Sequence, residues 1–76
     1  MGILRDINNE LNKESVYFII KDLIIDEEEA IDGYEKAKQQ LKNTDIKYAE
    51  YKKAEDVFNH IIEEEREHIR ELKELL

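Results

Sequence analysis

The sequence predicts an all-α protein: an antiparallel two-helix hairpin that pairs with a second copy of itself into a four-helix bundle. The 76 residues include no proline and only two glycines, so long helices are favoured over a sheet with many turns. Apolar residues recur at alternating steps of three and four along two segments, which is typical of packed helices. A chain this short seldom buries enough apolar surface to be stable alone, which indicates self-association.

The first long helix is predicted over residues 14–42, after a short N-terminal helical segment over residues 1–12. That segment carries Ile3, Leu4, Ile7 and Leu11 at helical spacing. The asparagines around it predict a break between Asn12 and Ser15. The apolar stripe of the long helix comprises Val16, Ile20, Leu23, Glu27, Ala30, Tyr34, Ala37 and Leu41, widened by Ile24 and Ile31.

The second long helix is predicted over residues 46–75, because Asn43, Thr44 and Asp45 provide stop and restart signals between the two helices. Its stripe comprises Tyr51, Ala54, Phe58, Ile61, Glu65, His68, Leu72 and Leu75, widened by Ile62, Ile69 and Leu76. Residues 1–76 are therefore expected to form a single helical-hairpin domain.

Three ionisable residues occupy these apolar stripes, namely Glu27 on the first helix and Glu65 and His68 on the second. A carboxylate in an apolar core is costly unless a positive charge compensates it. Lysines and arginines lie off both stripes, so a bound metal ion would supply that charge. Glu65 and His68 are three residues apart and can converge on one ion. The predicted connection lies midway between Glu27 and Glu65, so a hairpin places all three at the same height.

Two copies of the chain would offer four glutamates and two histidines, the ligand set of di-iron carboxylate bundles. Carboxylates with imidazole suit iron, manganese or zinc better than calcium or magnesium. Two other interpretations stay open. In the first, Glu65 and His68 form a surface pair at the edge of a coiled coil. In the second, Glu27 is a polar core residue that fixes the register of the helices. Tyr34 is expected to pack in the core with its hydroxyl near the site.

The charge of the chain limits its partners. Twenty acidic residues against 12 basic ones give a net charge of −8, which argues against nucleic acid as a partner. No apolar run is long enough to span a bilayer and no signal peptide is visible, so we expect no membrane partner and a cytoplasmic location. The absence of cysteine excludes disulfides and thiolate metal sites.

The stretch from Asp26 to Tyr34, followed by Glu64-Glu65-Arg66-Glu67-His68, resembles the encapsulated ferritins, which are two-helix halves of the ferritin fold. It is similar, more loosely, to the first helix pair of ferritins and rubrerythrins. The resemblance implies a ferritin-like bundle with a di-iron centre at a dimer interface and a homodimer that assembles into a decameric ring. It also implies ferroxidase activity that supports iron storage inside an encapsulin nanocompartment, with the encapsulin shell protein as a partner.

Carried over by position, the resemblance makes Glu27, Glu65 and His68 the iron ligands and Tyr34 the nearby catalytic tyrosine. Asp26 and Glu29 match acidic positions of an outer site through which metal enters, and Glu64 flanks the ligands. Gly33 stands where the family has a tryptophan. Two other functions stay open. One is a non-enzymatic self-assembly or adaptor module with a structural metal. The other is rubrerythrin-like peroxide reduction, in which Glu64 would serve as that family's additional glutamate.

Overall fold

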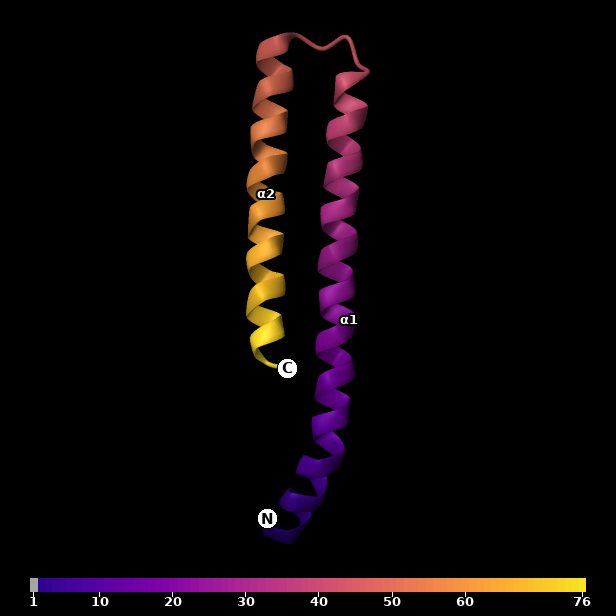
Figure 1. Cartoon of the computed structure of the whole chain (residues 1–76), viewed down its shortest axis with the longest axis vertical. Coiled ribbons are helices and arrows are strands. Elements are labelled where there is room, and N and C mark those ends of the chain that lie inside the picture. Colours follow the sequence, from indigo (N-terminus) through magenta and orange to yellow (C-terminus); the bar gives the residue numbers. More distant parts are fainter. Residues whose placement is uncertain (1) are drawn as a thin grey trace.

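The computed structural model describes the backbone of residues 2–76 and the side chains of residues 13–76. The chain forms two antiparallel helices, α1 (Gly2–Lys42) and α2 (Tyr48–Glu74), joined by a short loop (Figure 1). No strand occurs in the part of the chain whose backbone is described. The hairpin measures 64 × 15 × 15 Å. The predicted all-α hairpin is therefore confirmed, whereas its pairing with a second copy stays a prediction.

The loop between the helices begins where the sequence predicts it. After Lys42, the Thr44 hydroxyl donates a hydrogen bond of 2.8 Å to the carbonyl of Leu41, which satisfies one of the free carbonyls at the end of α1. α2 begins at Tyr48, two residues later than predicted. The residue before it, Lys47, has extended backbone angles and makes no capping hydrogen bond through its side chain.

The N-terminal part of α1 differs from the prediction. α1 is one helix from Gly2 to Lys42 and continues through Asn12–Ser15, where the sequence predicted a break. No proline or glycine lies at that point to remove a backbone hydrogen bond, and an asparagine lowers helix stability only by a few tenths of a kcal/mol. The apolar stripe predicted for Ile3, Leu4, Ile7 and Leu11 lies outside the residues whose side chains are described.

The contact between the helices is centred on one residue of the first predicted stripe, Ile20, and on two that the sequence placed beside the stripes, Ile24 and Ile62. Among the described side chains these three are the buried apolar ones, at 5, 7 and 2% exposure. Val16 and Leu23, predicted to lie in the core, are 48 and 44% exposed. The contact line follows Ile20 and Ile24, which turns Val16 and Leu23 toward a flank that α2 does not cover.

Two cross-helix contacts define the register of the hairpin. The rings of Tyr34 and Phe58 lie 5.7 Å apart, and Lys38 donates a 2.7 Å hydrogen bond to the side-chain oxygen of Asn59. Positions 34 and 38 on α1 therefore lie beside 58 and 59 on α2. Continuing this register toward the N-terminus of α1 places Glu27 at the height of the Glu65–His68 turn, as the sequence predicts.

A hydrogen bond within α2 makes one prediction about pH. The Tyr51 hydroxyl donates to Glu55 at 2.9 Å, and this bond is the main reason that the pKa of Glu55 lies below its ordinary value, with a smaller contribution from Lys52. We expect Tyr51→Phe to raise the pKa of Glu55 toward its ordinary value. The stabilisation from Glu55 is present above its unfolded pKa and is lost as the pH falls through the lower, folded pKa.

This prediction can be checked by NMR titration of the Glu55 carboxyl carbon. Tyr48→Phe is the matched control, because Tyr48 is 77% exposed and removal of its hydroxyl should leave the Glu55 pKa unchanged. A Glu55 pKa that is the same in wild type and Tyr51→Phe would show that the hydrogen bond is not the cause.

Candidate metal centre

The structure brings together the three ionisable residues that the sequence predicted as metal ligands. Glu27 comes from α1, and Glu65 and His68 come from successive turns of α2. Each offers one ligand atom, and these atoms all lie within 4.8 Å of one another. Convergence of two helices is needed for this group, since the pair on α2 supplies only one carboxylate and one imidazole.

Glu27 is the residue whose surroundings most favour a cation. Its Oε2 is buried and has no hydrogen-bond partner among the described residues. The nearest opposite group is His68 Nδ1 at 3.6 Å, which is longer than a hydrogen bond. A buried carboxylate oxygen without a partner is destabilising, and a bound metal ion would remove that penalty.

The ligand group lies at one open flank of the hairpin. A groove beside it is lined by Leu23, Glu27, His68, Glu71, Leu72 and Leu75. The His68 side chain is 48% exposed and that of Glu27 25%. The sequence did not identify Glu71, one of many charged residues of α2, although its spacing of three from His68 places it on the adjoining turn. Metal ions, or a second protein chain, can reach the ligands from this flank.

Tyr34 lies outside the ligand group. It follows Glu27 by seven residues, about 10 Å along the helix. Its ring packs on Phe58. The structure therefore agrees with the packing role, and the redox role that the resemblance implies for Tyr34 stays a prediction.

The acidic residues expected around the site are also not part of the ligand group. Asp26 and Glu29 are exposed on α1. Glu64 is exposed, and its Oε1 lies 2.6 Å from Nε2 of His60, one turn away on the same helix. The outer roles predicted for these three residues stay predictions.

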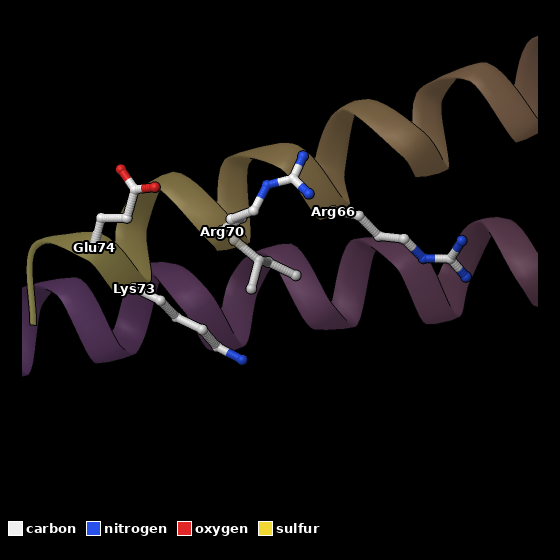
Figure 2. Close-up of a pocket in the computed structure, with 5 residues that line it drawn as sticks. Arg66, Arg70, Lys73 and Glu74 are labelled. Atoms are coloured by element: carbon white, nitrogen blue, oxygen red, sulfur yellow. The ribbon is translucent and has the colours of Figure 1, made fainter.

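A second groove lies on another side of α2. It is lined by Arg66, Ile69, Arg70, Lys73 and Glu74. Figure 2 shows Arg66, Arg70 and Lys73 on successive turns of α2. Each of these three residues comes two positions, or about half a helical turn, before His68, Leu72 or Leu75. The second groove therefore faces roughly away from the groove beside the ligand group. Three cationic side chains repel metal ions, so this groove is not a second metal site.

The ligand group offers two carboxylates and one imidazole from a single chain. This donor set fits iron, manganese or zinc. Among the described residues, no lysine or arginine forms an ion pair with Glu27 or Glu65. Iron in carboxylate bundles takes ligands from four helices. One hairpin supplies two helices, so it supplies half of such a set.

Comparisons with models of protein families, with curated proteins and with solved structures found no match to this chain. Within the described part of the chain, neither helix contains a segment that is both long and apolar enough to cross a membrane.

Proposed function

We propose that two copies of the chain form a four-helix bundle that binds two iron ions at its centre and oxidises Fe(II), a ferroxidase activity that supports iron storage. The observation that carries this proposal is the convergence of Glu27, Glu65 and His68, with one Glu27 oxygen buried and unpaired. Doubling this group yields four glutamates and two histidines, with Glu-x-x-His on two of the four helices.

The surface of the single hairpin supports a partner. The chain exposes 6332 Å², whereas a compact folded monomer of 9.1 kDa exposes about 4,900 Å². The difference, about 1,400 Å², exceeds the roughly 800 Å² that each partner contributes to a standard interface. Val16, Leu23 and Val57 are each between 44 and 49% exposed, so apolar side chains contribute to this exposed surface.

Each ligand would have a definite role with iron as the substrate. Glu27, Glu65 and His68 from each copy would hold the two ions, with the carboxylates supplying negative charge and His68 a nitrogen ligand. The second ring nitrogen of His68 would donate a hydrogen bond that fixes the orientation of the ring. Carboxylate oxygens favour Fe(III) over Fe(II), which promotes loss of one electron from each of two ions. Dioxygen would accept both electrons and, with two protons, leave as hydrogen peroxide.

The test is the rate of Fe(II) oxidation in air, followed by the absorbance of Fe(III). We expect Glu65→Ala to slow oxidation by about tenfold or more. Mutation of a residue that only hydrogen-bonds to a metal ligand already lowers metal affinity or activity by about tenfold, and loss of a ligand itself should cost at least as much. Glu63→Ala is the matched control, since Glu63 lies on the same helix, is 71% exposed and pairs with Arg66. Equal rates for wild type and Glu65→Ala would overturn the proposal.

One alternative has an observation in its favour. Only three apolar side chains are buried among the described residues, so a metal ion could serve to hold the helices of a self-assembly or adaptor module together. Two results together would favour this structural role: the oligomer dissociates when a chelator is added, and the protein oxidises Fe(II) no faster than buffer alone.

The other parts of the resemblance have less support. Peroxide reduction depends on Glu64, which contacts His60 and lies outside the ligand group. The decameric ring and the encapsulin shell rest on the resemblance alone, and they stay predictions.

A further inference from the structure

One flank of the hairpin is apolar and uncovered, and we call it the open flank. Its residues are Val16, Ile19, Leu23, Ala30 and Ala37 on α1 and Ala54, Val57, Ile61, Leu72 and Leu75 on α2. Their steps of three, four, seven and eleven place each set on one helix face. The groove beside the ligand group joins Leu23 to Leu72 and Leu75, so both sets lie on the same side of the hairpin.

The open flank extends beyond the end of α2. Because Glu27 lies beside the Glu65–His68 turn, Leu75 reaches only about the height of residue 18 on α1. Figure 1 shows α1 running past the C-terminus of α2. Val16 and Ile19, 48 and 58% exposed, therefore lie at or beyond the end of α2. A partner that covers them must reach further along α1 than α2 does.

Side-chain size changes along the open flank of α1 at Glu27. The residues before it are large, namely Val16, Ile19 and Leu23. Those in the turns directly after it are small, namely Ala30 and Ala37, with Gly33 between them at the edge of the flank, and the large Leu41 follows only in the last turn of α1. A Cβ added at Gly33 would meet nothing within 4 Å, so this hairpin alone provides no steric reason for a glycine. Glycine within a helix costs about 0.5–1 kcal/mol relative to alanine, which a close neighbour in the assembly would explain.

We infer that a second copy covers the open flank with its own open flank, α1 lying antiparallel against α1, around a two-fold axis perpendicular to the helices at the height of Glu27. This orientation rests on the proposed two-copy site and completes it, since both ligand groups then meet at the axis. A residue before Glu27 on one copy lies beside the residue equally far after Glu27 on the other. Leu23 meets the Ala30 turn of the second copy, and Val16 meets the Ala37 turn.

The pairing of large with small residues along α1 is what distinguishes this orientation. The α2 helices lie antiparallel about the same axis, with Ile61 beside Leu72 and Val57 beside Leu75 of the other copy, so along α2 large residues face large ones. Leu75, 68% exposed in one hairpin, is thereby covered. The hairpin turn of each copy also reaches along the overhanging part of α1 in the other copy.

A two-fold axis parallel to the helices would leave more apolar surface uncovered. It would place α1 against α2 of the second copy at equal heights, so the large residues of α1 would not face its alanine turns. Both overhanging ends of α1 would then project from the same end of the bundle on diagonally opposite helices. Val16 and Ile19 would stay exposed in that arrangement.

Disulfide cross-linking tests the orientation directly, since the chain has no cysteine of its own. We expect the double variant Leu23→Cys/Ala30→Cys to form a covalent dimer on mild oxidation. Within one chain these positions lie about 10 Å apart, too far for a disulfide. Each single variant should stay non-covalent. Leu23→Cys/Ala37→Cys is the control, because its second cysteine lies a further seven residues away. No covalent dimer from the first pair, or an equal yield from the control, would overturn the inference.

A size swap provides a second test that needs no disulfide. Ala30→Leu should weaken dimerisation by about tenfold, because two large side chains then oppose each other. Adding Leu23→Ala should restore it, since each introduced leucine then faces an alanine of the other copy. Sedimentation equilibrium measures both dissociation constants, and a double variant no tighter than Ala30→Leu would overturn the inference.

The cross-linking result tests the orientation of the two copies independently of the test for Fe(II) oxidation. Cross-linking as expected without Glu65-dependent Fe(II) oxidation would support the orientation and overturn only the activity. Glu65-dependent oxidation without the cross-link would overturn only the orientation.

Discussion

Replacing Glu27 and Glu65 together by leucine is expected to raise the unfolding temperature of the metal-free protein while abolishing metal binding. The two carboxylates are partly desolvated, and Oε2 of Glu27 is unpaired. Replacing buried charged groups with apolar residues of similar volume often stabilises a protein by about 1–4 kcal/mol. For a domain of this size, 1 kcal/mol corresponds to about 4–8 °C. Thermal unfolding in a chelator, followed by circular dichroism, measures the shift.

The control for this prediction is Glu63→Leu/Glu67→Leu, which removes the same charge from exposed positions of α2 that pair with arginines. Both double variants reduce the net charge of −8 and its self-repulsion equally. Only the loss of Glu27 and Glu65 removes desolvated carboxylates. If both double variants shift the unfolding temperature equally, or if Glu27→Leu/Glu65→Leu still binds iron, the ligand group has no special role.

Ile24→Ala is expected to destabilise the protein by about 2–5 kcal/mol, whereas Ile25→Ala should have a small effect. The two neighbours lose the same atoms from the same turn of α1. Ile24 is 7% exposed and Ile25 is 48% exposed. Ile24 is one of three buried apolar side chains among residues 13–76, so its loss removes a large share of this core. Total stabilities of small domains are only about 5–15 kcal/mol.

Urea unfolding of the two variants in a chelator measures this difference without the contribution of bound metal. Ile24→Ala should unfold at a clearly lower urea concentration than Ile25→Ala at equal protein concentration. Equal midpoints would mean that the contact line between the helices does not pass through Ile24, and the register of the hairpin would then need revision.

The sequence predicted the hairpin well because its signals are local. The end of α1 at Lys42 follows from the polar residues after it, and Thr44 makes the hydrogen bond there. The convergence of Glu27 with Glu65 and His68 follows from helical spacing and from a turn midway between them. A difference arose at Asn12–Ser15, where weak helix formers do not end a helix that has no proline or glycine at that point.

Which residues of each apolar stripe contact the other helix was less predictable. Val16 and Leu23 fit a core stripe as well as Ile20 and Ile24 do, because a broad apolar face allows several contact lines. The structure selects the line through Ile20, Ile24 and Ile62. Glu71 was missed for a related reason, since the sequence alone does not show whether a charged residue of a helix lines a groove or faces solvent.

By itself, the sequence determined that the protein is a helical hairpin with two carboxylates and one imidazole at a common height. Periodicity specifies which residues share a face of one helix, and the position of the turn specifies which residues share a level. Only the tertiary structure decided how each helix is rotated about its axis, because that rotation depends on side-chain packing between the two helices. It is this rotation that left one Glu27 oxygen buried without a partner and placed the ligand group at an open apolar flank.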